Sequence, residues 1–206
     1  MKKFLIASLI TFAAAAPAVA QQPMPIPGRA DVAAVEVGNY KVDTGHTQVL
    51  WQLNHLGFSL FDGQFGGVTG TLALDPKNPA AAKLNVTIPM SGLSTTVGKL
   101  TEHLNAPDFF DSAKYPTATF VSTSVMAHGT TAHITGNLTL HGVTKPVTLV
   151  TTFVGAGKGM FGAKATNVGF EATATIKRSD FGIAYGIPAI GDEVKLRINA
   201  AFEKVN

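Results

Sequence analysis

The 206-residue chain contains no cysteine, one tryptophan and few charged residues, which make up 14% of the total. Without cysteine there is no disulfide framework, no thiol nucleophile and no thiolate metal ligand. Stability must therefore come from burial of apolar side chains, which account for 46% of the residues. A chain of this length can bury a sizeable core as one domain without cross-links.

Motifs of catalysis are also lacking. No Gly-x-Ser-x-Gly nucleophile elbow occurs. The six histidines show neither His-x-His nor His-Glu-x-x-His spacing, although a zinc site assembled from distant histidines stays open. The glycine-rich run 155–159 fails as a phosphate-binding loop, because Thr152 replaces its first glycine and Gly159 replaces its Ser or Thr. We therefore expect no catalytic residue, no cofactor and no metal.

The first twenty residues have the pattern of a signal peptide. Lys2 and Lys3 precede an apolar run from Phe4 to Ala16, and residues 18–20 form an Ala-Val-Ala cleavage site. The run is too short for a membrane-spanning helix, which needs ~20 apolar residues. We expect cleavage before Gln21, export to the periplasm and no integral membrane segment in the mature chain.

Removal of that segment leaves 14 basic and 13 acidic side chains, because Lys2 and Lys3 leave with it. The net charge of +1 and the lack of a basic cluster with interleaved aromatics argue against nucleic acid as a partner. Residues 21–39 follow as a proline-rich leader, with Pro23, Pro25 and Pro27 at alternate positions. This pattern favours extended backbone without a packing face, so we expect an unpacked arm before a domain over 40–206.

Apolar and polar residues alternate through most of this domain. The alternation, with Thr, Val and Phe enriched and Gly, Pro and Asn between the runs, predicts β-strands. Short links make the strands antiparallel, and an even number of them closes naturally into a barrel without free edges. We predict an all-β, eight-stranded antiparallel barrel; a two-sheet sandwich is the alternative. The predicted strands lie near 49–53, 68–75, 84–88, 117–126, 131–140, 146–154, 165–177 and 193–203.

One segment departs from the alternation. Val97, Leu100 and Leu104 are spaced at i, i+3 and i+7 before Pro107, which predicts a short helix that covers one end of the barrel. The sequence Asp-Phe-Phe-Asp follows at 108–111. Adjacent rings cannot both face inward on a strand, so we expect an irregular turn with one ring under the helix and the other toward the interior.

Other phenylalanines also lie in Gly- and Asp-rich segments outside the alternation. Such aromatics at the mouth of a barrel either plug it or line an entrance, and the sequence leaves both interpretations open. They are Phe58, Phe61, Phe65 and Phe181.

Several stretches together resemble a known family. The segment 108–116 (DFFDSAKYP), the segment 136–146 (GNLTLHGVTKP) and the segment 178–182 (RSDFG) are similar in order and spacing to the YceI-like, polyisoprenoid-binding proteins. The resemblance covers 40–203. It implies a lipocalin-like barrel, exported to the periplasm, that binds a long isoprenoid such as a quinone or polyprenyl phosphate. One departure is the sequence LTEH at 100–103, where the family commonly has Arg-Asp-x-His.

We therefore expect a lipid-binding carrier, not an enzyme, with an isoprenoid or other long-chain lipid as its partner. The alternatives are a barrel enzyme (a metal-dependent hydrolase or an isomerase) and a structural stress protein with a filled core. The sequence leaves open whether the chain forms a homodimer. The residues expected to contact the lipid tail are Trp51, Leu53, Leu72, Leu74, Phe109, Phe110, Phe120, Leu138, Phe170 and Ile176. Those expected near the head group are Lys99, His103, Arg178 and Asp180.

Overall fold

The computed structural model describes residues 24–160 and 165–205, so the expected signal peptide lies outside the described residues. The described part contains eleven strands, one α-helix and four short 3-10 helices. The strands are β1 (Gly38–Val42), β2 (Gln48–His55), β3 (Ser59–Phe65), β4 (Thr69–Leu74), β5 (Lys83–Pro89), β6 (Leu93–Ser94), β7 (Thr117–His128), β8 (Thr131–Leu140), β9 (Val143–Lys158), β10 (Thr166–Lys177) and β11 (Glu193–Lys204). The helices are η1 (Val32–Ala34), η2 (Pro79–Ala81), η3 (Met90–Gly92), α1 (Gly98–Leu104) and η4 (Arg178–Phe181).

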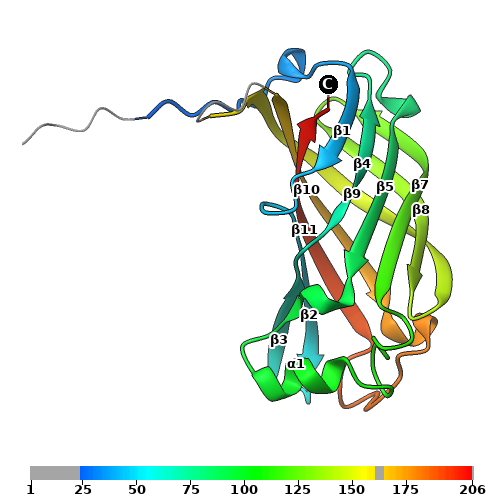
Figure 1. Ribbon diagram of the computed structural model, residues 1–206. Coiled ribbons are helices and arrows are strands. Elements are labelled where there is room, and N and C mark those ends of the chain that lie inside the picture. Colours follow the sequence, from blue (N-terminus) through cyan, green and yellow to red (C-terminus); the bar gives the residue numbers. More distant parts are fainter. Residues whose placement is uncertain (1–23, 161–164, 206) are drawn as a thin grey trace, which may run out of the picture.

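The strands form one closed antiparallel barrel (Figure 1). The ring runs β1-β4-β5-β7-β8-β9-β10-β11 and returns to β1 through the β1–β11 pairing. Strand β11 pairs first with β2, through 195–199, and then with β1, through 202–204. Strands β1 and β2 therefore lie end to end beside β11 and share one position in the barrel wall. Strands β4 and β3, which pair with β1 and β2 respectively, share the next position. The predicted eight-stranded barrel is confirmed, and the sandwich is wrong.

Strand β3 is an element that the sequence did not predict. Phe61 and Phe65 are not loop aromatics, because they lie on this strand and face the interior. Gly63 lies between them and has no side chain, so the sequence lacks the apolar residue that the alternation would place at this inward position. A Cβ atom at Gly63 would lie 2.2 Å from the Trp51 indole, so glycine is what lets the ring cross the neighbouring strand. Phe58, at the β2–β3 turn, is 89% exposed.

The outer wall of the barrel carries hydroxyl groups that pair across strands. The Oγ1 atoms of Thr135 and Thr148 lie 2.9 Å apart, and those of Thr139 and Thr144 lie 2.8 Å apart. Both pairs join β8 to β9. Cross-strand pairs of this kind contribute roughly 0.2–1 kcal/mol each relative to alanine pairs.

The proline-rich leader does not remain an unpacked arm over its whole length. Arg29 exchanges backbone hydrogen bonds with Ala156 of β9, at 3.0 and 2.9 Å. Asp31 caps η1, and Val35 is buried in the main core. Residues 29–36 therefore pack over one end of the barrel, opposite to α1 (Figure 1). The sequence prediction was wrong here because the packing depends on a few contacts that have no periodic pattern.

Glu36 fixes this segment to three strands. Its carboxylate accepts hydrogen bonds from Lys204 Nζ at 2.8 Å, from Thr166 Oγ1 at 2.7 Å and from Lys158 Nζ. These residues belong to β11, β10 and β9. The hydrogen bonds from Lys158, Lys204 and Thr166 lower the pKa of Glu36 to about 2 from its usual value of 4.5. The charged carboxylate is thus the form that holds the segment in place.

We predict that Glu36→Gln removes a stabilising contribution that depends on pH. Because the folded-state pKa is lowered, the contribution is fully present above about pH 4.5 and is lost as the pH falls through about 2. The difference in unfolding free energy between wild type and Glu36→Gln, measured by urea denaturation, should therefore shrink between pH 5 and pH 2. Glu203→Gln is the control, since Glu203 pairs with Lys41, at 3.1 Å on the outer surface. A difference that is equal at pH 2 and pH 6 would contradict the prediction.

Candidate functional site

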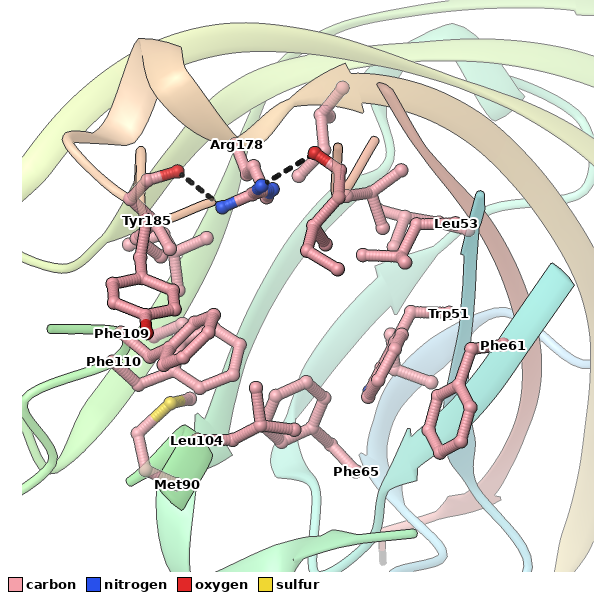
Figure 2. A pocket seen from close by; sticks show the side chains of 18 of the residues that line it. Trp51, Leu53, Phe61, Phe65, Met90, Leu104, Phe109, Phe110, Arg178 and Tyr185 are labelled. Atoms are coloured by element: carbon pink, nitrogen blue, oxygen red, sulfur yellow. Dashed lines mark hydrogen bonds between the residues drawn. The ribbon is translucent and has the colours of Figure 1, made fainter. Parts of the chain in front are cut away.

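The barrel encloses an apolar cavity of about 300 Å³ at the end covered by α1 (Figure 2). Strands β2, β3, β8, β10 and β11 supply inward side chains, and α1 contributes Leu100, His103 and Leu104. The predicted cover of one barrel end by the helix is therefore present. The cavity-lining residues that were expected from the sequence are Trp51, Leu53, His103, Phe109, Phe110, Leu138, Ile176 and Arg178.

A second cavity, of about 180 Å³, lies at the opposite end, beside Val32 and Val35 of the N-terminal segment. We call these the helix-end cavity and the leader-end cavity. Leu72, Leu74 and Phe170, which were expected to contact the same tail as Trp51, line the leader-end cavity.

Three expected site residues line neither cavity. Phe120 is buried in a second hydrophobic cluster, with Leu138 and Leu149. Lys99 and Asp180 are exposed. The structure thus brings most of the expected apolar residues to the interior, in two groups, and leaves these two charged residues on the surface.

Among the four residues expected near the head group, Arg178 is the most buried and makes the most hydrogen bonds. It is 5% exposed, and burial lowers the pKa of its guanidinium. Its Nε donates to Gly191 O at 2.8 Å, Nη1 to Ile183 O at 3.1 Å and Nη2 to Ile190 O at 2.9 Å. Figure 2 shows the guanidinium at the edge of the cavity, with its hydrogen bonds to the carbonyl groups of Ile183 and Ile190. Arg178 therefore anchors the loop 182–192, which gives the cavity wall Ile183, Tyr185 and Ile190.

His103 belongs to an aromatic cluster at the mouth of the helix-end cavity. Its ring lies edge-on to Phe109, with centroids 5.0 Å apart, and edge-on to Tyr185, at 5.7 Å. Phe109 and Tyr185 are themselves 5.1 Å apart. The Nε2 atom of His103 lies 2.8 Å from Asp108 Oδ2. The cluster joins α1, the segment after it and the loop held by Arg178.

Phe109 and Phe110 lie in an irregular turn, as their sequence context predicted. The amide of Phe109 donates to Ala106 O and that of Phe110 to Leu104 O, both at 3.0 Å, and Asp111 has a φ of 45°. Phe109 packs on the helix side against His103. Phe110 packs edge-on against Phe65 of β3, with centroids 5.5 Å apart. The two rings have different aromatic neighbours, but both line the cavity, whereas the sequence led us to expect only one ring toward the interior.

Several lining residues were missed by sequence reasoning. Phe61 and Phe65 could have been found from their even spacing around Gly63. Ile183, Tyr185 and Ile190 had no comparable signal, because their loop has no periodicity. Phe181, in contrast, lines neither cavity, because it is 1% exposed and packs in the second hydrophobic cluster. The other missed residues are Val49, His55, Ile88, Met90, Leu100, Leu104, Ala118, Leu140, Val194 and Leu196.

The three segments that carry the family resemblance meet at the helix end. Tyr115 lies edge-on to His141, with centroids 4.8 Å apart, and His141 Nδ1 lies 3.0 Å from Phe181 O. His141 and Gly142 have φ values of 51° and 74°, as a tight β-hairpin turn between β8 and β9 requires. The three segments therefore contact one another and form the structural frame of this end of the barrel.

Within residues 24–160 and 165–205, helices are too short or too polar to cross a bilayer. The same residues include no group of three or more His, Cys, Asp or Glu side chains placed to hold a metal ion.

The fold and the cavity together define a lipocalin-like antiparallel barrel with an apolar interior. A profile of the YceI-like domain matches residues 40–202, and the chain belongs to this family. Protein YceI of Escherichia coli O157:H7 is 44% identical over 163 residues, which cover 78% of this chain and 84% of that protein. A UPF0312 protein of Pseudomonas aeruginosa strain LESB58 is 41% identical over the same length and coverage.

Solved structures show the same fold. BcnA of Burkholderia cenocepacia has a TM-score of 0.67 at 25% identity, over 78% of this chain and 98% of that chain. A YceI protein of Campylobacter jejuni has a TM-score of 0.65 at 30% identity, over 74% and 90%. A polyisoprenoid-binding domain from Saccharophagus degradans, implicated in plant cell wall breakdown, is alike in fold, with a TM-score of 0.59 at 15% identity, over 82% and 100%.

We predict that Phe110→Ala and Phe109→Ala both weaken binding of an apolar fluorescent probe, because both rings line the cavity. Truncation of a fully buried Phe costs ~3–5 kcal/mol. These rings are half-buried, so we expect about 2–3 kcal/mol for Phe110, which packs on buried Phe65, and about 1–2 kcal/mol for Phe109. Denaturant melts and probe titration measure the two effects. Phe58→Ala, at an exposed turn, is the control and should change stability by less than about 0.5 kcal/mol. Normal probe binding by both cavity variants would show that the turn is not part of the site.

Proposed function

We propose that this protein is a periplasmic carrier that holds one long-chain isoprenoid lipid, of quinone or polyprenyl phosphate type, inside the barrel and acts without catalysis. The observation that carries the proposal is the apolar helix-end cavity of about 300 Å³, enclosed by the barrel wall, α1 and the aromatic turn. Membership of the YceI-like family supports it. The binding of polyisoprenoid by the similarly folded Saccharophagus degradans domain points in the same direction.

The physics of such a cavity favours a hydrocarbon tail. Each buried CH₂ group contributes ~0.8 kcal/mol, so ten sequestered carbons contribute about 8 kcal/mol before the cost of ordering the ligand. Trp51, Leu53 and Ile176 provide apolar contacts, which do not fix the orientation of the tail within the cavity. A water-soluble carrier needs no further chemistry in the tail region.

The mouth favours a neutral head group over an anionic one. The guanidinium of Arg178 already donates three hydrogen bonds to backbone carbonyls, and the imidazole of His103 is paired with the Asp108 carboxylate. A phosphate would meet that carboxylate, whereas a quinone ring can stack on Phe109 and Tyr185. A prenylated quinone is therefore the preferred ligand of the two classes.

The alternative of a structural protein with a filled core fits the interior less well, because the described residues enclose two cavities. The alternative of a barrel enzyme has two histidine–aspartate pairs, His103–Asp108 at the mouth and His46–Asp43 at 2.7 Å on the exposed surface. Among the described residues, neither histidine is hydrogen-bonded to a hydroxyl group that could act as a nucleophile. The geometry supports binding best.

We predict that the protein, purified without added lipid, releases an apolar molecule on solvent extraction, and that native mass spectrometry shows the corresponding complex. After delipidation, a short prenylated quinone should quench the fluorescence of Trp51, which lines the cavity. It should also raise the melting temperature with increasing ligand concentration.

A matched pair of variants controls this test. Leu53→Gln places an amide in the cavity and should reduce quinone binding at least tenfold. Leu50→Gln changes the same strand at a position that does not line either cavity and should leave binding unchanged. The proposal would be contradicted if no molecule could be extracted and neither Trp51 fluorescence nor the melting temperature responded to the quinone. That outcome would favour the alternative of a structural protein with a filled core.

We also predict processing before Gln21, as the pattern of the first twenty residues indicates. Expression in a Gram-negative host, osmotic-shock release and intact-mass measurement check it. An intact mass that retains residues 1–20, or protein found only in the cytoplasmic fraction, would overturn the periplasmic assignment.

A further inference from the structure

Two segments at the mouth of the helix-end cavity expose apolar side chains to solvent. One is the tip of the β2–β3 hairpin, where Phe58 is 89% exposed, Leu60 56% and Leu56 46%. The other is the loop held by Arg178, in which Tyr185 is 53% exposed. The hairpin reaches the end of the barrel that α1 covers (Figure 1). We call these two segments, residues 53–61 and 181–191, the apolar rim.

Backbone hydrogen bonds join the two segments of the apolar rim into one surface. The amide of Leu56 donates to Ala189 O at 2.9 Å, and the amide of Gly191 donates to Asn54 O at 2.8 Å. Other side chains of the same segments, among them Phe61, point inward and line the helix-end cavity. The apolar rim is therefore continuous with the cavity wall.

The geometry of the hairpin tip does not explain its apolar residues. The amide of Phe58 donates to His55 O at 3.1 Å, and Leu56 and Gly57 have φ values of 58° and 74°. A turn with two positive φ values favours Asn, Asp or Gly at the first of these positions, because a bulky side chain is strained there. Leu56 is therefore a costly choice for the turn and is not buried by it. A contiguous exposed apolar surface of this kind is typical of a site of interaction.

The apolar rim contains no Asp, Glu, Lys or Arg, although these residues make up 14% of the chain. Since charged side chains are costly to move into a bilayer, a surface without them is suited to enter one. Three of the four residues that adjoin the two segments are acidic, namely Asp62, Asp180 and Asp192. Their carboxylates disfavour contact with an anionic surface. The lipid surface that fits this distribution of charge is therefore zwitterionic.

We propose that the apolar rim is a docking surface for a bilayer of zwitterionic lipid, from which the cavity takes up its cargo by direct contact. This proposal rests on the proposed function and adds to it the route by which the cargo arrives. A long isoprenoid does not readily leave a bilayer through water, because each CH₂ group that becomes exposed adds to the cost. When the rim lies in the interface, the tail passes from one apolar medium to another without crossing water. Leu, Phe and Tyr are side chains suited to this interface.

The first test measures binding to vesicles. Wild type should sediment with phosphatidylcholine vesicles, and its binding should not weaken between about 0.1 and about 1 M salt, because uncharged contacts are not screened. Addition of phosphatidylglycerol to the vesicles should not strengthen binding. Phe58→Glu should lower the partition coefficient at least tenfold. Met126→Glu is the matched control, because Met126 is 64% exposed and its neighbours Val125 and Ala127 line the leader-end cavity, at the other end of the barrel.

The second test measures transfer of a prenylated quinone from phosphatidylcholine vesicles to the delipidated protein, followed by Trp51 fluorescence. The rate should rise in proportion to the vesicle concentration, because each transfer requires a contact. Phe58→Glu should slow the transfer about tenfold and leave its extent at equilibrium unchanged, since Phe58 lines neither cavity. Leu60→Glu, also outside both cavities, should act in the same direction and decides the question if Phe58→Glu lacks a cooperative melt.

The docking surface would be overturned by a transfer rate that does not depend on vesicle concentration, or by equal effects of Phe58→Glu and Met126→Glu. A wild-type dimer that Phe58→Glu dissociates, measured by analytical ultracentrifugation, would also overturn it, because a second copy of the chain would then cover the rim. Failure of wild type to bind a short prenylated quinone added without vesicles would instead overturn the proposed function. The two failures are therefore distinguishable.

Discussion

The closure of the barrel through β11 is the constraint on which the rest of the structure depends. One edge of this strand pairs with β10, and the other pairs in turn with β2 and β1. Each strand of the ring therefore has a hydrogen-bonded neighbour on both sides, and its backbone polar groups are used within the wall. Since unpaired polar groups are costly to bury, this pairing is what allows the interior to be lined by apolar side chains. A cavity suited to hydrocarbon follows from the closure.

Much of this fold could be predicted from the sequence, because side chains of a strand alternate between the two faces of the sheet. The alternation located β7, β8 and β11 within a few residues, and the spacing of Val97, Leu100 and Leu104 located α1. It failed at β3, where Gly63 replaces an inward side chain to admit the Trp51 ring. The alternation rule depends on the polarity of side chains, so it cannot identify an inward position such as Gly63, where the structure requires that no side chain be present.

The site was predicted less completely than the fold. Periodicity tells which residues face inward but not how far along the barrel they lie, so Trp51 and Phe170 were assigned to one site although they line different cavities. The loop 182–192 was missed because hydrogen bonds from Arg178 to backbone carbonyls hold it, and carbonyl groups are common to all residues. Glu36 was missed since its partners, Lys158 and Lys204, are remote in sequence.

The hydroxyl pairs of the outer wall have a consequence for the surroundings that the barrel tolerates. Ion pairs on a surface weaken as dissolved salt rises, because the screening length falls from about 10 Å at 0.1 M to about 3 Å at 1 M. The pairs Thr135–Thr148 and Thr139–Thr144 are uncharged, so dissolved salt does not weaken them by screening. The β8–β9 wall therefore contains cross-strand contacts whose strength does not depend on the salt concentration of the medium.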